Sequence, residues 1–266
     1  MCSVLGFLKR LVAYRSIIRI MAMSTVRNRY AGTFGGIIWA LANPLMIVFV
    51  YWFVFSVGFK IQPPNNIPFI VIFLAGQIPW MMFSETLLAN VNAVTGNIHL
   101  IKKTIFPIEI LPFVNLTANL VNHGIMLLIL TFVIRWNHLP LSLYNLQFLY
   151  YLLALSVFSI GLGWFFSALN VLSRDISQVL AVILNLWFWL TPVVWIADTL
   201  PSQFHVLVRV NPLAYIVEGY RDSFFRQVPF WHHFREGLYF WIVCFSTIAF
   251  GGFVFRKLKT EFADIV

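Results

Sequence analysis

Charged side chains are scarce in this sequence. Lys, Arg, Asp and Glu make up 10% of its 266 residues, whereas an ordinary soluble domain carries about 25%. So few charges cannot cover the surface of a soluble protein of this size, and 61% of the residues are hydrophobic. The bilayer is the natural solvent for the long apolar runs that account for this excess. The sequence therefore predicts an all-α membrane protein with a single transmembrane domain over residues 1–266.

Other absences narrow the function. The two cysteines, Cys2 and Cys244, form neither a disulfide framework nor a metal or redox spacing. The dipeptide Gly-Lys does not occur, so a phosphate-binding loop is absent. The first twenty residues are too charged for a cleavable signal peptide, and we expect the first span to direct insertion. We predict no catalytic residues, no metal and no cofactor in this chain. Nucleic acid is not an expected partner, because Lys and Arg flanking a bilayer explain the net charge of +9.

Six apolar stretches follow one another along the chain. Each is near or above the roughly 20 residues that a helix needs to cross a bilayer. The strands of a β-barrel would be about half as long and would alternate in polarity. The predicted spans are residues 34–58, 67–94, 106–134, 146–172, 176–197 and 238–255.

Residues 7–30 are too basic for a span. As a helix, they place apolar side chains on one face (Phe7, Leu11, Tyr14, Ile18 and Met21) and basic ones on the other (Lys9, Arg19 and Arg27). This pattern predicts an amphipathic helix lying along anionic headgroups. A basic tail with accidental periodicity is the alternative.

The basic residues also predict the orientation. With the N-terminus in the cytoplasm, twelve of the eighteen Lys and Arg residues fall in cytoplasmic segments. The positive-inside rule therefore favours an inner-membrane protein with both termini in the cytoplasm, which an even number of spans allows.

The connection at residues 198–237 differs from the others, because Pro201, Pro212 and Pro229 interrupt it. We expect two short re-entrant helices here, broken at Asn211-Pro212 and shielded by protein or water. The alternative is an ordinary extracytoplasmic loop.

Polar residues within the spans indicate packing or passage. Asn115, Asn119 and Asn122 recur at helical spacing and share one face, which either joins helices or lines a channel. A ridge of small residues, Ser159, Gly163 and Ser167, favours close helix packing. Glu85 is an intramembrane carboxylate and so a functional candidate, although a Glu that faces a partner helix or a water-filled lumen explains it better.

Aromatic side chains gather at the end of the fifth span. Trp187, Thr191 and Trp195 are expected on one face, with Trp189 beside them. Such rings can line a path for sugars, and they can equally anchor the helix at the headgroups.

Two cytoplasmic turns are candidates for contact with a partner. Residues 96–104 form a short loop with a basic end, and Arg174-Asp175 begins a helix. We expect Asp175 to cap that helix, with Gln178 in capping-box spacing.

Four segments together resemble one family. They are Arg29-Tyr30 with Phe34-Gly35, Trp39 and Pro44; residues 100–112 (LIKKTIFPIEILP); residues 170–195 with Arg174-Asp175-Ile176 and Leu190-Thr191-Pro192-Val193-Val194; and Asn211-Pro212-Leu213 with Tyr220-Arg221. In this order they are similar to the permease subunits of ABC-2 type polysaccharide exporters, in the branch that exports O-antigen and teichoic acid.

The resemblance implies a homodimeric channel for a lipid-linked polysaccharide, most simply O-antigen, driven by two separate ATPase subunits that hold ATP and Mg. The short helices would form an outer gate at Asn211, Pro212, Tyr220 and Arg221. The ATPases would contact the amphipathic helix and the cytoplasmic turns, through Arg27, Arg29, Asn97, Ile98, His99, Leu100, Ile101, Lys102, Lys103, Arg174 and Asp175. The channel-lining candidates are Trp187, Trp189, Trp195, Asn115, Asn119 and Asn122.

Other functions remain open from the sequence. An ABC-2 exporter of a drug, lipid, teichoic acid or capsule would share this architecture. A secondary transporter would need internal repeats and intramembrane charges, and a transferase would need clustered acid and base groups. The sequence shows neither feature.

Overall fold

The computed structural model describes residues 9, 11–32, 34–36, 38–60, 67–98, 106–197, 200–260 and 262, apart from the side chains of Tyr30 and Ser202. Every regular element in these residues is helical. Within the described residues, five helical segments are long and apolar enough to cross a membrane: Ile38–Gly58, Phe69–Val91, Ile108–Trp136, Leu143–Leu172 and Phe230–Leu258. The prediction of an all-α, multi-pass membrane protein is confirmed at this level.

The long helices are joined to short 3₁₀ or π segments at several ends. Their bounds are α3 Ile38–Trp52 with η1 Phe53–Gly58, α4 Phe69–Val91 with η3 Thr95–Asn97 after it, η4 Ile108–Ile110 with α6 Leu111–Trp136, η5 Leu143–Gln147 with α7 Phe148–Leu172, and η9 Phe230–His233 with α11 Phe234–Leu258.

The bounds predicted for the first and last spans need correction. The first span was expected from residue 34, but residues 34–36 form a turn and α3 begins at Ile38. The last span was expected over 238–255, and α11 is longer at both ends. Glu236 and Arg256 lie inside it, because charged side chains near the ends of a spanning helix can reach the interface while the backbone stays helical.

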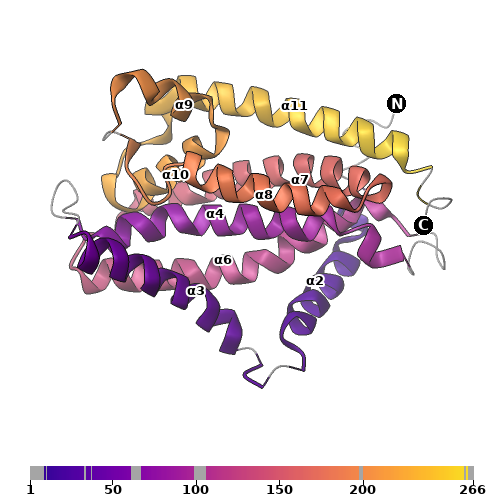
Figure 1. Cartoon of the computed structure of the whole chain (residues 1–266), viewed down its shortest axis with the longest axis horizontal. Coiled ribbons are helices and arrows are strands. Elements are labelled where there is room, and N and C mark those ends of the chain that lie inside the picture. Colours follow the sequence, from indigo (N-terminus) through magenta and orange to yellow (C-terminus); the bar gives the residue numbers. More distant parts are fainter. Residues whose placement is uncertain are drawn as a thin grey trace.

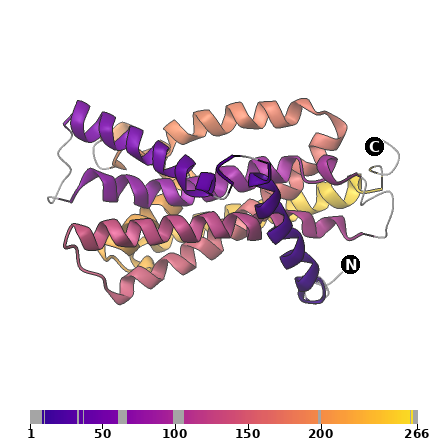
Figure 2. The same cartoon turned by 90° about the horizontal axis from the view of Figure 1, so that it is seen from below.

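Helix α4 is the centre of the bundle. About 78% of its most apolar stretch is buried, against 17% for α3. Helices α6, α7 and α8 pack around it, and Figures 1 and 2 show them running along a common direction. Because α4 is mostly apolar and has no distinct polar face, it fits the middle of a bundle.

Helices α7 and α11 form the most extensive helix pair. They approach at two glycines, since a Cβ on Gly251 would lie 2.1 Å from the carbonyl oxygen of Gly161. Small residues allow this close backbone contact between membrane helices. The predicted ridge behaves similarly toward α4, where a Cβ on Gly163 would lie 2.5 Å from the Asn90 amide nitrogen. Ser159 and Ser167 of the same ridge are buried.

Helix α2, Arg15–Tyr30, runs steeply across the direction of the bundle (Figure 2, indigo). Its inner face packs on α6, where Ala22 meets Val114 and Ala118. Of the predicted apolar face, Ile18 and Met21 pack against this cluster, and Phe7 lies outside the described residues. Lys9, Arg19 and Arg27 are exposed.

Helix α8 is shorter than the predicted fifth span of 176–197. It covers Asp175–Leu190, 16 residues, and the chain leaves the helix at Thr191, whose ψ is 138°. Pro192 explains this end, because a proline disfavours the helical conformation of the residue before it. Trp187, Thr191 and Trp195 therefore do not share a helix face. Figure 1 shows α8 running along the same direction as α4 and α7, and α8 contacts both helices.

Two short helices, α9 His205–Val210 and α10 Pro212–Arg221, follow in the predicted region. They separate at Asn211, whose side chain accepts a hydrogen bond from the backbone of Leu213. Proline at the first position of α10 suits a helix start. A π turn, η8 Asp222–Arg226, continues α10.

Two ends of the bundle can now be defined. The basic end holds α2, the turn at Arg174 and the end of α11, and the opposite end holds α9 and α10 (Figure 1).

Candidate functional site

A polar cluster joins α2 to the core of the bundle near the basic end. The Arg29 guanidinium donates to Asn119 Oδ1 at 2.8 Å and lies 3.5 Å from the Glu85 carboxylate. Asn119 in turn donates to Thr86 at 3.0 Å, and Asn122 donates to Glu85 at 3.4 Å. Arg29 thus points into the bundle, and the predicted amide face holds three helices together. Whether these amides also line a channel stays a prediction.

The same amide face continues toward the end of α4. Asn115 donates to Asn90 Oδ1 at 3.0 Å, and Asn90 lies against Gly163 of α7. Asn90 is fully buried, and Asn115 satisfies its amide oxygen, while its amide nitrogen has no hydrogen-bond partner among the described residues. The spacing of three asparagines indicated this face, but Thr86 and Asn90 give no such signal in the sequence.

The turn between α7 and α8 is capped from the preceding helix. Asn170 Oδ1 accepts the backbone N–H of Ser177 at 3.2 Å, and its amide donates to Asn92 at 3.3 Å. The predicted capping box is wrong, because Arg174 occupies the N-cap position without a side-chain bond and Asp175 is the first helical residue. The Asp175 carboxylate still lies in the first turn, where its negative charge interacts favourably with the positive end of the helix dipole.

The predicted partner-binding loop is described only at its start. Asn97 ends η3 and donates to the Ala93 carbonyl at 2.8 Å, and Ile98 follows it. His99, Leu100, Ile101, Lys102 and Lys103 lie outside the described residues. Arg174 and Asp175 are exposed at the same basic end, as is Arg27.

An ion pair closes this end of the bundle. Lys259 Nζ lies 2.6 Å from Glu109 Oε1, and the Trp164 indole donates to the Glu109 carbonyl at 3.1 Å. The pair ties the end of α11 to the residues that precede α6. It joins positions 150 residues apart, which no local pattern could have indicated.

At the opposite end, Asn211 links α8 to the break between the short helices. Trp187 Nε1 donates to Asn211 Oδ1 at 2.9 Å, and the Asn211 amide donates to Thr191 Oγ1 at 2.9 Å. Trp189 is exposed, and Trp195 donates to the Trp189 carbonyl at 3.0 Å. The tryptophans are therefore in three different environments.

Arg221 is fully buried beside this network. Its guanidinium lies 2.7 Å from the Glu218 carboxylate and donates to the carbonyls of Val193 at 3.1 Å and Trp195 at 3.2 Å. Burial lowers the pKa of Arg221, and the adjacent Glu218 opposes that effect. Tyr220 is equally buried and bonds His123 at 3.1 Å. Both residues anchor α10 to the bundle.

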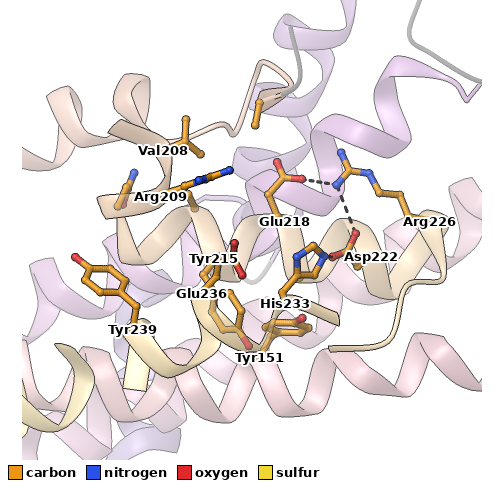
Figure 3. Close-up of a pocket in the computed structure, with 14 residues that line it drawn as sticks. Tyr151, Val208, Arg209, Tyr215, Glu218, Asp222, Arg226, His233, Glu236 and Tyr239 are labelled. Carbon is orange, nitrogen blue, oxygen red and sulfur yellow. Dashed lines mark hydrogen bonds and ion pairs between the residues drawn. The ribbon is translucent and has the colours of Figure 1, made fainter. Parts of the chain in front are cut away.

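A pocket of about 190 Å³ opens between α10 and the start of α11 (Figure 3). Its charged wall is a chain of ion pairs in which Arg226 joins Glu218 to Asp222, and His233 lies 3.1 Å from Asp222. Three tyrosine rings, Tyr151, Tyr215 and Tyr239, and Asn211 also line the pocket, as do the charged residues Arg209 and Glu236. Aromatic rings beside paired charges can hold a polar, uncharged ligand. Of this group, only Asn211 was among the predicted gate residues.

Comparison with known proteins agrees with this architecture. A family model described as ABC-2 type transporter matches residues 17–225. The O-antigen export system permease protein RfbA of Klebsiella pneumoniae is 26% identical over 252 residues, 93% of each chain. RfbA of Myxococcus xanthus is 27% identical over 82% of this chain and 84% of its own. The polysialic acid transport protein KpsM of Escherichia coli is 22% identical over 77% and 80%.

Proposed function

Because this chain belongs to the ABC-2 type transporter family, which confirms the resemblance seen in its sequence, we propose that it is the membrane subunit of an ATP-driven exporter of lipid-linked polysaccharide. The observation that carries the proposal is the similarity to O-antigen export permeases over 93% of both chains. O-antigen is therefore the substrate we propose. A separate chain hydrolyses ATP, since this sequence has no Gly-Lys pair for a phosphate-binding loop.

In the proposed assembly, two copies of the chain form the channel and two ATPase subunits dock at the basic end. Six helices span the inner membrane, with α8 as the shortest, and the basic end faces the cytoplasm. The asymmetry of the basic residues supports this orientation. The steep angle of α2 to the bundle supports an interfacial position for it (Figure 2).

The proposed route for the ATPase signal has two contacts. One is the segment from Asn97 to Lys103 with the turn at Arg174-Asp175. The other is α2. Its exposed face carries Arg27, and its Arg29 pairs with Glu85 of α4 and donates a hydrogen bond to Asn119 of α6. A movement of α2 would reach the core through Arg29, because the guanidinium bonds both helices at once.

The proposed outer gate consists of α9 and α10. Asn211 connects the break between them to Trp187 and Thr191 at the end of α8. Arg221 fixes α10 to the turn after α8. We therefore propose that the end of α8 and the gate helices move together.

The test is reconstitution. The chain is purified with the ATPase encoded beside it and placed in proteoliposomes with lipid-linked O-antigen. We expect export that requires ATP and both subunits. A vesicle preparation with an ATPase whose Walker lysine is replaced serves as the control. Export by this chain alone, or export driven by an ion gradient without ATP, would contradict the proposal.

A further inference from the structure

A second cavity, of about 540 Å³, opens on the side of the bundle between α2, α3, α4 and α6. Arg29 and Glu85 lie in it with two amides, Asn43 and Asn122, while the Trp39 ring and Leu88 form its apolar part. The side chains of Arg29 and Glu85 remain 32% and 36% exposed. The cavity therefore presents charged and amide groups at an open surface.

Two residues of this surface lie inside helices that are long enough to cross a membrane. Glu85 precedes the last residue of α4 by six positions, which is about 9 Å at the rise of an α-helix. Asn122 lies eleven positions into α6, about 16 Å from its start. Polar groups facing hydrocarbon at such depths are costly unless water or a polar partner meets them.

The cavity has unused hydrogen-bonding capacity. Glu85 receives both of its bonds on Oε2, from Arg29 and Asn122, and Oε1 has no donor among the described residues. The Asn43 amide likewise bonds no other described side chain or backbone group. A ligand can therefore donate to Glu85 and both donate to and accept from Asn43.

The charges in the cavity select the ligand. Arg29 and Glu85 compensate each other, and one Arg29 nitrogen is already bound to Asn119. A phosphate would meet the Glu85 carboxylate, whereas a hydroxyl can bond the carboxylate, the amides and the guanidinium alike. The Trp39 ring, 45% exposed, offers an apolar face to the C–H side of a sugar ring.

From this geometry we propose that the cavity is a binding subsite for the neutral, hydroxylated headgroup of a membrane amphiphile, namely a sugar close to its lipid anchor. The sugar occupies the space between Asn43 and Glu85, and the lipid chain leaves past Leu88, which is itself exposed. This inference rests on the proposed function, because it names where the exported glycolipid first contacts the permease on the side of the basic end.

The test uses three photoreactive probes with one diazirine-bearing dodecyl chain and different headgroups: maltoside, phosphate and phosphocholine. Membranes containing the full chain and its ATPase are irradiated with each probe without ATP, and the labelled peptides are identified by mass spectrometry. We expect the maltoside to label the peptides around Trp39 and Leu88 most strongly. Asn43→Leu should lower that labelling about fivefold, the loss expected for one neutral hydrogen bond.

Asn43→Leu should leave the fold intact, because Asn43 is exposed and bonds no other described residue. Glu85→Gln is the second variant and retains an acceptor for Asn122. The matched control is Gln203→Leu, which removes an exposed amide far from the cavity. Equal labelling by all three headgroups, stronger labelling by the phosphate, or cross-links between two copies of the chain at these residues would each overturn the inference.

The reconstituted export assay separates this inference from the proposed function. Normal ATP-dependent export together with headgroup-independent labelling would refute the sugar subsite alone. Maltoside-specific labelling in a chain that fails to export with its ATPase would refute the exporter and leave the subsite standing.

Discussion

Replacing Arg221 with methionine tests whether the buried guanidinium holds α10 in place. Methionine has a stem of similar shape but cannot donate hydrogen bonds, so the carbonyls of Val193 and Trp195 lose their charged donor. Glu218 keeps Arg226 as its partner, so no carboxylate is left unpaired. The change therefore isolates the contacts made by one side chain.

The magnitude follows from the charge. Neutral hydrogen bonds between membrane helices are worth only about 0.6 kcal/mol each, and two of them would amount to little. Hydrogen bonds from a charged group are worth about 1.5–3 kcal/mol each, and Arg221 is fully buried. We expect Arg221→Met to lower the free energy of unfolding by about 3 kcal/mol. Arg221→Lys should lose about half as much, since an ammonium reaches fewer acceptors.

The assay is unfolding of the detergent-solubilised chain in sodium dodecyl sulfate, followed by tryptophan fluorescence. Arg209→Met is the control, because Arg209 is exposed on neighbouring α9 and should change stability by less than about 0.5 kcal/mol. If Arg221→Met were as stable as its parent, the guanidinium would not be holding α10 and the reasoning would fail.

Two further predictions concern packing and the basic end. Gly219→Ala should destabilise the chain by about 1–3 kcal/mol in the same assay, because the new Cβ would lie 2.1 Å from the Tyr151 ring, whereas Gly124→Ala meets nothing within 4 Å and should be tolerated. Each single variant, Glu109→Lys or Lys259→Glu, places two like charges together and should reduce ATP-driven export. The double variant, which exchanges the two charges, should restore it. The partly exposed pair should add at most about 1 kcal/mol to stability, so the free energy of unfolding should change little. Failure of the double variant to recover export would argue against the pairing.

Much of the fold follows from local chemistry. Apolar runs of span length predicted the long helices, and the break at Asn211-Pro212 was predicted because proline begins α10 and cannot continue α9. The spacing of Asn115, Asn119 and Asn122 correctly placed them on one face. Local chemistry also explains the largest error, which is the predicted length of the fifth span. Pro192 ends α8 early, and the prediction rested on apolar composition without considering this proline.

The site could be predicted only in part. The family resemblance implied that Arg29 contacts the ATPase. In the structure its side chain bonds Asn119, which is 90 residues away in the sequence. The cap of α8 comes from Asn170, although Asp175 offered the expected local pattern. The first partner is 90 residues away and the second lies seven residues earlier, in the preceding helix, so the periodicity of a single helix identifies neither.

The sequence by itself determined that the chain lies in a membrane, that it is helical and that its basic residues gather toward one side, because transfer of side chains between water and lipid depends on composition and order alone. The tertiary structure decided which polar groups meet. It turned Arg29 inward, buried Arg221 against backbone carbonyls and paired Glu109 with Lys259. A charge that is wholly or partly removed from water is stabilised by whatever partner the packed helices bring within reach.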